Sequence, residues 1–391
     1  MFKIQTFNTI DSDGLSLLST EEYEVGSQLT NPDAIILRSY DMHDMELPSS
    51  LKAVARAGAG VNNIPIERCT EKGIVVFNTP GANANGVKEL VVAGLMLASR
   101  DIIKGVMWAN SLLGNNNKIP DLVEKGKKNF AGQEIRGKTL AVIGLGAVGV
   151  LVANAARGLG MNVVGYDPFL SVEQAIKLST KVALVKELDV LLAQADYVSL
   201  HIPLTTENEG YINKDLIKMM KDNVRILNFS RGELVVVDEL KEAIELGKVA
   251  RYVSDFPEEE LMKLDNVITI PHLAASTKES EVNSAVMAVK QVRDFLENGN
   301  IVNSVNFPTV SMERHKGCRI LIANKNVPNM VSQISTVLAS EDINIDSMLN
   351  RKYNGNAYNI IDITRKSIDE SVVEKLRAIN GVSMVRTICG E

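Results

Sequence analysis

Short apolar runs recur along the first three quarters of the chain, and helix-like spacing of apolar residues follows many of them. The runs are apolar throughout rather than alternating with polar residues. This is typical of parallel strands that helices cover on both faces. The first part of the chain therefore predicts a small α/β unit, with strands at 2–7, 34–37, 51–57 and 74–77 and an apolar helix at about 87–99.

A strand–turn–helix–strand pattern at residues 138–167 dominates the middle of the chain. After the run 139–143, Gly144, Gly146 and Gly149 have the spacing G-x-G-x-x-G, and a helical pattern and a second run ending at Asp167 follow. In a dinucleotide-binding βαβ unit, the first glycine permits a tight turn, the second admits the pyrophosphate and the third lets helix and strand pack closely. Asp167 is placed to accept hydrogen bonds from ribose hydroxyls and would repel a 2′-phosphate, which predicts NAD rather than NADP.

Four further apolar runs, each ending in polar residues, follow this unit. Such runs predict parallel strands whose carboxyl ends share one edge of a sheet, where open α/β folds bind ligands. We therefore expect a site at this edge. The runs with their polar endings are 197–200 with 201–203, 225–227 with 228–232, 251–253 with 254–257, and 267–270 with 271–277.

The residue types at this edge suit hydride transfer between a nicotinamide and a secondary alcohol, which needs a group that takes the hydroxyl proton. Of the four histidines, His201 and His272 follow predicted strands. His201 precedes Ile-Pro, which favours a cofactor contact or a structural role, so His272 is the better acid/base. Arg231 offers two donors to a substrate carboxylate. The acidic run 258–260 could supply a carboxylate to His272 or could be a solvated loop.

Two polar segments of the first α/β unit could bind an anion. Arg38 follows the strand 34–37, and the glycine-rich loop 58–63 follows the strand 51–57. Backbone N–H groups of such a loop can cradle a carboxylate. From its position alone, Arg38 is better explained as a solvated loop arginine, and a plain turn explains the glycine-rich loop about equally well. Residues 101–136 are polar and less periodic, which predicts a surface helix with Trp108 and a loop connecting two domains.

The composition shifts after residue 308, and residues 317–391 predict a separate unit. Its strands and helices follow in the order βαββαβ, which is the ferredoxin-like arrangement. The expected strands are 318–323, 343–351, 357–364 and 382–388, and the expected helices are 331–340 and 371–378.

Length, charge and cysteine content narrow the class of protein. The 391 residues suffice for two or three domains, and the net charge of −6 argues against a nucleic-acid surface. No apolar stretch reaches the about 18 residues of a membrane span, and the first residues do not predict a signal peptide. The three cysteines match neither a disulfide framework nor a metal site, so we expect reduced thiols in a cytoplasmic protein without a metal.

The order of these motifs resembles the D-isomer-specific 2-hydroxyacid dehydrogenases over roughly residues 30–305. The resemblance implies an NAD-binding Rossmann domain (101–280) inserted in a split flavodoxin-like substrate domain (1–100 and 281–308). It also implies that Arg231 binds the substrate's carboxylate and carbonyl, that His272 is the acid/base and that Glu259 pairs with it. Besides the glycines and Asp167, the implied cofactor contacts are Thr79, Ala147, Val148, His201, Ile202, Pro203, Phe229, Ser230, Asp255, Leu273, Ala274 and Ala275.

Two positions depart from the family's usual residues. The chain reads Ser254-Asp255-Phe256 where the family usually reads Asp-Val-Phe, so either Ser254 or Asp255 takes the nicotinamide-side position. The tail, 317–391, resembles an ACT domain, but Asn329 replaces its usual glycine. Asparagine is tolerable there because it also enters the left-handed region.

The resemblance extends to substrate and effector. A dehydrogenase followed directly by an ACT domain implies 3-phosphoglycerate as substrate, a homodimer or homotetramer, and serine or another amino acid bound at Asn326 and Asn344, or else an oligomerisation module without a ligand. Arg38 and Ser39 would hold the phosphate, and Ala59, Gly60 and Val61 the carboxylate. The alternatives are a reductase of another 2-oxoacid, such as hydroxypyruvate or glyoxylate, and a non-catalytic NADH-sensing corepressor.

Overall fold

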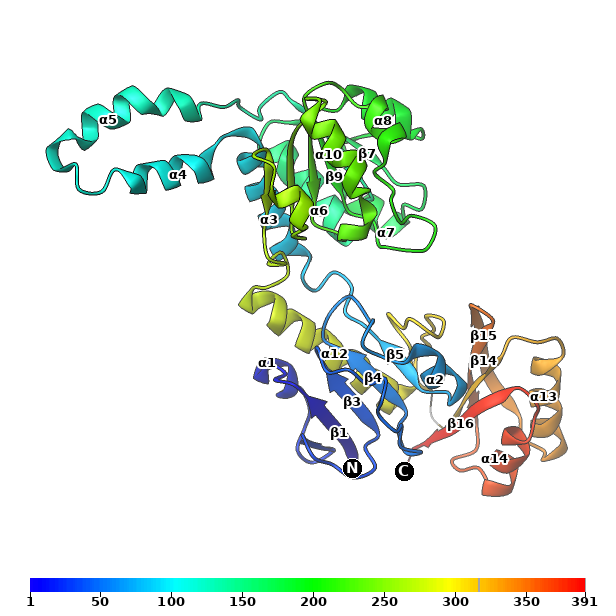
Figure 1. Ribbon diagram of the computed structural model, residues 1–391. Helices are drawn as coiled ribbons and strands as arrows, with labels where there is room; N and C mark the ends of the chain where they lie inside the picture. Colours follow the sequence, from blue (N-terminus) through cyan, green and yellow to red (C-terminus); the bar gives the residue numbers. More distant parts are fainter. Residues whose placement is uncertain (316, 391) are drawn as a thin grey trace. The chain divides into compact units, whose positions relative to one another are not determined.

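The computed structural model describes residues 1–315 and 317–390, and the chain divides into two compact units (Figure 1). The first unit contains Met1–Asn83 and the chain from Glu281 onward, and the second contains Ala84–Ser280. The helix α3 (Ala84–Ser99) thus belongs to the second unit, whereas the sequence predicted it in the first. The reason is its apolar face, because Val91 and Leu95 pack in the same core as Leu140.

Five parallel strands form the main sheet of the first unit, in the order β2-β1-β3-β4-β5. This is the flavodoxin-like order, as predicted. The short edge strand β2 was not predicted, because two of its four residues are exposed. The elements are β1 (Phe2–Phe7), α1 (Ser12–Leu15), β2 (Tyr23–Gly26), β3 (Ala34–Leu37), β4 (Ala53–Arg56), α2 (Ile66–Glu71), β5 (Val75–Phe77) and α12 (Lys278–Asn298).

Seven parallel strands form the sheet of the second unit, in the order β12-β11-β10-β9-β6-β7-β8. From β6 the strands follow one another on one side to β8, and then on the other side from β9 to β12, as in a Rossmann fold. This order confirms the predicted fold class. The strands are β6 (Thr139–Ile143), β7 (Asn162–Tyr166), β8 (Ala183–Leu184), β9 (Tyr197–Leu200), β10 (Val224–Asn228), β11 (Val249–Ser254) and β12 (Val267–Thr269). The helices beside α3 are α6 (Ala147–Gly158), α7 (Val172–Lys177), α8 (Leu188–Gln194), α9 (Lys214–Met219), α10 (Val237–Glu245) and α11 (Glu259–Met262).

The segment predicted as one surface helix and a loop forms two helices that extend away from the sheet of their own unit (Figure 1). They are α4 (Ile102–Ser111) and α5 (Ile119–Gly126), and each is followed by a short 3₁₀ turn. Trp108 packs on Phe130 with ring centroids 5.2 Å apart. No residue of α4 or α5 is buried.

The C-terminal part of the first unit is a four-stranded antiparallel sheet in the order β14-β15-β13-β16. This topology is ferredoxin-like, as predicted. One face carries both helices over a core that includes Ile320, Ile334 and Leu376. The elements are β13 (Cys318–Lys325), α13 (Met330–Ser340), β14 (Ile345–Tyr353), β15 (Asn356–Ile363), α14 (Glu370–Arg377) and β16 (Val382–Cys389). Asn329 has φ +68°, so it takes the left-handed conformation expected of it.

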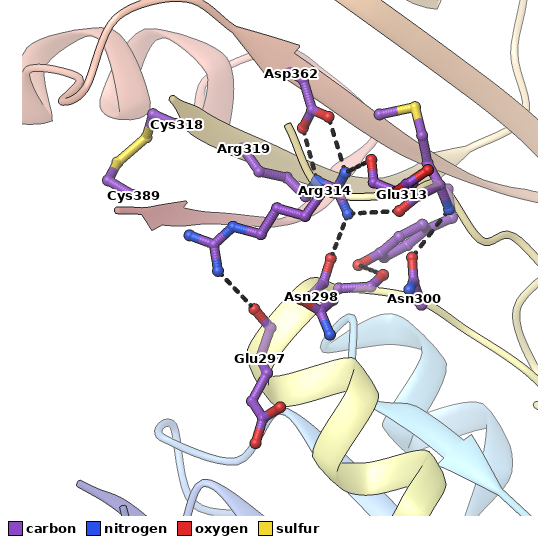
Figure 2. A network of polar contacts seen from close by, with 12 residues as sticks. Glu297, Asn298, Asn300, Glu313, Arg314, Cys318, Arg319, Asp362 and Cys389 are labelled. Atoms are coloured by element: carbon purple, nitrogen blue, oxygen red, sulfur yellow. Dashed lines mark hydrogen bonds and ion pairs between the residues drawn. A yellow bond between two sulfur atoms is a disulfide. The ribbon is translucent and has the colours of Figure 1, made fainter. Parts of the chain in front are cut away.

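The opposite face of this sheet packs against the rest of the first unit, although the sequence predicted a separate unit. Leu321 and Tyr358 share a hydrophobic core with Phe77, Phe295 and Phe307. The strand β13 explains the difference, because its first seven residues are buried and it therefore needs partners on both faces. Figure 2 shows the polar counterpart, in which the buried Arg319 joins Asp362 of β15 to the end of α12.

The prediction of three reduced cysteines is wrong for two of them. Cys318 and Cys389 form a disulfide (Figure 2). Cys69 is free and buried. The two residues are 71 positions apart, but the antiparallel pairing of β13 with β16 sets them directly opposite each other. Within residues 1–315 and 317–390, no helix is long and apolar enough to cross a membrane and no cluster of side chains could hold a metal ion.

Candidate active site

The glycine turn between β6 and α6 has the geometry that the sequence predicted for a dinucleotide. Gly144 has φ +90°, and a Cβ there would lie 2.5 Å from the carbonyl oxygen of His201. A Cβ on Gly149 would lie 1.9 Å from the carbonyl oxygen of Gly144. Gly146 differs, since apart from its own chain neighbours no atom of the described residues lies within 4 Å of the place where its Cβ would be. The turn is therefore tight on its protein side and open at Gly146, at the N-terminus of α6.

Asp167 lies at the carboxyl end of β7 and is held against this turn. Its carboxylate accepts hydrogen bonds from the backbone N–H groups of Leu145 and Phe169, both at 2.8 Å. A carboxylate has about four acceptor positions. Asp167 can therefore accept further hydrogen bonds beside the turn. Gly146 leaves room for a pyrophosphate, so these residues fit an NAD molecule.

His201 and Ser230 lie at the carboxyl ends of the neighbouring strands β9 and β10. A ring nitrogen of His201 is 2.9 Å from the hydroxyl of Ser199, and burial lowers the pKa of His201 to about 3. The ring is therefore neutral at ordinary pH and cannot supply a proton, in agreement with a contact or structural role. The hydroxyl of Ser230 donates to the carbonyl of Leu200 at 2.8 Å, which ties the two strand ends together.

Arg231 follows β10, and its backbone position depends on a buried asparagine. The side-chain amide of Asn228, fully buried, donates to the carbonyl of Arg231 at 2.8 Å. The Arg231 guanidinium is exposed and donates to the carbonyl of Ser230 at 2.7 Å. Among the ion pairs of the described residues, none involves Arg231. Its remaining donors are thus available to a carboxylate.

His272 follows β12 in an unusual backbone conformation. Its φ is +52°, and its backbone N–H donates to the carbonyls of Asp255 and Ile270 at 3.0 and 2.9 Å. Its exposed ring lies edge-on to Phe256, with centroids 5.0 Å apart. The left-handed conformation is strained for a non-glycine residue and is common at functional sites.

Asp255 holds the loop that carries His272. Its side chain is fully buried, and its two oxygens accept from the backbone N–H groups of Leu273 and Ala274, both at 2.8 Å. The sequence predicted Asp255 among the cofactor contacts, and its carboxylate is bonded to this loop. Ser254 is also fully buried. Both Asp255 oxygens thus hold the backbone of the loop that follows His272.

The predicted pair of Glu259 and His272 is not formed. Glu259 is the first residue of α11, and its carboxylate lies 3.6 Å from the ammonium of Lys263. Glu260 is bonded to Lys241 and Lys263, which lower its pKa to about 2. Between the described residues Glu259 and His272 there is no hydrogen bond or ion pair. Glu259 and Glu260 are solvated and paired with lysines in this conformation.

The residues expected to bind the substrate lie in the first unit, after the carboxyl ends of β3 and β4. Arg38 forms an ion pair with Glu281 at 2.9 Å, so its guanidinium already has a carboxylate partner. Asn8 accepts hydrogen bonds from the N–H of Ser39 at 2.9 Å, and the amide of Asn63 donates to the carbonyl of Arg38 at 3.1 Å. These two asparagines fix the loop, and sequence reasoning missed both.

The loop of Ala59, Gly60 and Val61 is fixed from one side in the same unit. The side-chain amide of Asn78 donates to the carbonyl of Ala59 at 2.6 Å, and the backbone N–H of Thr79 donates to the carbonyl of Gly58 at 3.0 Å. The Thr79 hydroxyl is buried, and no hydrogen bond to it is found among the described residues.

The residues expected to bind an effector lie in the C-terminal part of the chain. Asn326 donates its backbone N–H to the carbonyl of Gly355 at 2.8 Å, and Asn344 is exposed.

The sequence and the structure are similar to those of known proteins. Residues 96–274 match the family model "D-isomer specific 2-hydroxyacid dehydrogenase, NAD binding domain". A D-3-phosphoglycerate dehydrogenase of Archaeoglobus fulgidus is 39% identical over 294 residues, which are 71% of this chain and 52% of that protein. One of Methanocaldococcus jannaschii is 35% identical over 333 residues, 80% of this chain and 61% of that protein.

A solved structure extends the similarity to the fold. An NAD⁺-bound 3-phosphoglycerate dehydrogenase of Entamoeba histolytica has a TM-score of 0.60 and 28% identity, and the match covers 78% of this chain and 98% of that one. The chain spans between half and two thirds of the length of the two curated relatives, at 52% and 61%.

Proposed function

Since the chain carries the NAD-binding domain of the D-isomer specific 2-hydroxyacid dehydrogenases, we propose that it oxidises D-3-phosphoglycerate to 3-phosphohydroxypyruvate with NAD, the first step of serine biosynthesis. The observation that carries the proposal is the set of groups found at the carboxyl edge of the second sheet. There, the open glycine turn with Asp167, the exposed Arg231 and the constrained His272 follow strands of one parallel sheet. A nucleotide site, a carboxylate-binding group and an acid/base are the components that this reaction needs.

The cofactor would be held by the turn and by Asp167. Gly146 admits the pyrophosphate to the N-terminus of α6, and Asp167 accepts from the ribose hydroxyls. When bound, NAD supplies the hydride acceptor. Because the Asp167 carboxylate would repel a 2′-phosphate, NAD should be used far better than NADP.

Side chains of the protein would bind the charged groups of the substrate and transfer its hydroxyl proton. Arg231 binds the carboxylate and carbonyl oxygens through its free N–H groups. His272 takes the hydroxyl proton during oxidation and returns it during reduction. Asp255 keeps the His272 loop in place. Glu259 would leave Lys263 to pair with His272, which would favour the protonated imidazole.

In the first unit, Arg38 and Ser39 would bind the phosphate and the loop of Ala59, Gly60 and Val61 the carboxylate. Arg38 must then exchange Glu281 for the phosphate. That ion pair is the one observation that favours the alternative, a reductase of unphosphorylated 2-oxoacids.

A homo-oligomer is supported by the apolar side chains that α4 exposes, Ile102, Ile103, Val106 and Met107. The C-terminal sheet would bind an amino acid or serve in assembly.

Steady-state kinetics with D-3-phosphoglycerate and D-glycerate test the substrate. We expect a strong preference for the phosphorylated acid, and Arg38→Ala should raise its KM by about ten- to a hundredfold, since a charged hydrogen bond is lost. Glu281→Gln is the matched control, because it releases Arg38 without removing it. An equal loss on both acids in Arg38→Ala would remove the phosphate assignment.

A further inference from the structure

Three polar side chains are buried together in the second unit, where β10 and β11 end. They are Asn228, Tyr252 and Ser254, and each is at most 2% exposed. Asn228 lies opposite Ser254 in the last residue pair of the two strands. Tyr252 lies two positions before Ser254, so both side chains point to the same face of the sheet. The strand register therefore brings the three groups together at the carboxyl edge of the sheet.

The hydroxyl of Tyr252 is the unexpected member of this cluster. Its ring packs in an apolar core with Ile226 and Leu240, and a phenylalanine ring would fill the same space. A phenol oxygen in such a core is costly unless it has hydrogen-bond partners. Burial raises the pKa of Tyr252, so its hydroxyl is neutral and can both donate and accept. The two polar groups beside it explain why a hydroxyl is tolerated there.

One of these groups is Asn228, whose side chain holds the segment with Arg231. Its amide donates to the carbonyl of Arg231 at 2.8 Å and to the hydroxyl of Tyr252 at 3.3 Å. Its side-chain oxygen accepts from the backbone N–H of Ser230 at 3.1 Å. The Tyr252 hydroxyl thus helps to fix the orientation of the amide on which the backbone of Arg231 depends.

The other group is Ser254, whose side chain holds the segment beside His272. The hydroxyls of Tyr252 and Ser254 interact, and Ser254 accepts from the backbone N–H of Phe256 at 3.1 Å. The ring of Phe256 lies edge-on to the ring of His272, with centroids 5.0 Å apart. A change at Tyr252 can therefore reach the ring of His272 through Ser254 and Phe256.

We propose that the Tyr252 hydroxyl is a positioning group, which sets the segments of Arg231 and His272 relative to each other. The inference rests on the proposed function, in which Arg231 binds the substrate carboxylate and His272 takes the hydroxyl proton. Both groups must meet one small substrate at the same time. Even a small shift of either segment should therefore slow the reaction.

The variant Tyr252→Phe tests the proposal, because it removes the hydroxyl and keeps the ring. We expect kcat/KM to fall by about two- to tenfold on whichever 2-hydroxyacid the wild type oxidises, the scale of one lost hydrogen bond between neutral groups. Both constants should contribute, with a higher KM from the Arg231 segment and a lower kcat from the His272 segment.

The variant Tyr197→Phe is the matched control. Tyr197 is also fully buried in the second sheet, but it is the first residue of β9 and therefore lies at the opposite edge. Its hydroxyl bonds with Ser99 at 2.7 Å and with Gln133 at 2.8 Å. The control thus loses the same buried group, so it should lower the Tm by a similar amount and leave kcat/KM unchanged.

The variant Ser254→Ala separates the two branches of the network. It breaks only the branch to Phe256 and His272, so it should lower kcat by about two- to tenfold and leave KM near the wild-type value. Combined with Tyr252→Phe, it should cost less than the sum of the two single changes, because both act through one network. A KM raised as much as in Tyr252→Phe would contradict the assignment of the branches.

Hydrogen exchange gives a readout that does not depend on activity. The backbone amides of Ser230 and Phe256 bond to Asn228 and Ser254, so in Tyr252→Phe they should exchange about two- to tenfold faster than in the wild type. In Tyr197→Phe they should exchange at the wild-type rate.

Three results would overturn the proposal. They are equal kcat/KM in the wild type and Tyr252→Phe, an equal loss of kcat/KM in Tyr197→Phe, and unchanged exchange at both amides. A wild type that oxidises no 2-hydroxyacid would instead refute the proposed function, and the exchange rates would then decide by themselves whether Tyr252 positions the two segments.

Discussion

Replacing Arg319 should loosen the C-terminal sheet from the rest of the first unit. The side chain is 1% exposed and all five of its N–H groups are bonded (Figure 2). Two go to the oxygens of Asp362 at 2.6 and 2.8 Å. The other three go to the carbonyls of Asn298, Met312 and Glu313 at 2.8, 3.0 and 2.8 Å. The guanidinium thus joins β13 and β15 to the end of α12 and to the segment between α12 and β13.

The expected loss of stability follows from the buried charge of Asp362, which would remain without a partner. In Arg319→Met, the Asp362 carboxylate, only 5% exposed, loses its cationic partner. Removing one member of a buried ion pair costs about 3–5 kcal/mol, whereas replacing both by apolar groups is often nearly neutral. The double variant Arg319→Met/Asp362→Leu should therefore be more stable than the single one. It should not regain wild-type stability, because three carbonyls have lost their donors.

Urea unfolding followed by circular dichroism gives the free energies, and hydrogen exchange of β13 and β15 locates the change. Arg314→Met is the control, because this exposed arginine makes a single hydrogen bond to the described residues, to the carbonyl of Glu297 at 3.2 Å. Its replacement should change stability by no more than about 0.5 kcal/mol. The reasoning fails if Arg319→Met costs as little as the control, or if the double variant is less stable than the single one.

Three further predictions concern the disulfide, His201 and Asp167. Reducing Cys318–Cys389 opens a loop of 71 residues and should lower the stability of the C-terminal sheet by about 4 kcal/mol, measured as the urea midpoint with and without dithiothreitol and absent in Cys389→Ser. His201 has a pKa lowered to about 3 by burial, whereas the unfolded chain binds this proton near pH 6.5. Stability should therefore fall by about 1.4 kcal/mol per pH unit between these values as the pH falls, and His201→Gln should flatten that part of the curve of Tm against pH. Asp167→Ala should narrow the ratio of kcat/KM for NAD over NADP, because it removes both the ribose contacts and the repulsion of a 2′-phosphate; equal efficiencies in the unmodified protein would contradict the assignment.

The features predicted well from the sequence are those that local rules determine. The glycine turn at 144–149, the strand ending at Asp167 and most strands of the sheets follow from apolar runs and glycine spacing, whereas the flavodoxin-like and Rossmann strand orders were implied by the family resemblance. Asn329 could also be predicted, because few residues tolerate a left-handed conformation at the start of a helix.

The features that the sequence did not reveal depend on contacts between distant segments. Apolar runs in β13 predict a buried strand, but not that α12 covers its second face. Cys318 and Cys389 meet only through the register of β13 and β16. Asn228 and Asp255 are polar residues at strand ends like many others, and only their burial and hydrogen bonds identify them as positioning residues. The Glu259–Lys263 pair reflects one conformation of a short helix, which spacing does not predict.

The central claim is tested most directly by following NADH formation at 340 nm with D-3-phosphoglycerate, in the wild type and in His272→Ala. We predict sustained turnover in the wild type and a loss of about a hundredfold or more in the variant, with NAD binding retained, because the variant lacks the group that takes the hydroxyl proton. A wild-type protein that binds NAD but forms no NADH from this acid, or a His272→Ala variant that turns over as fast as the wild type, would contradict it.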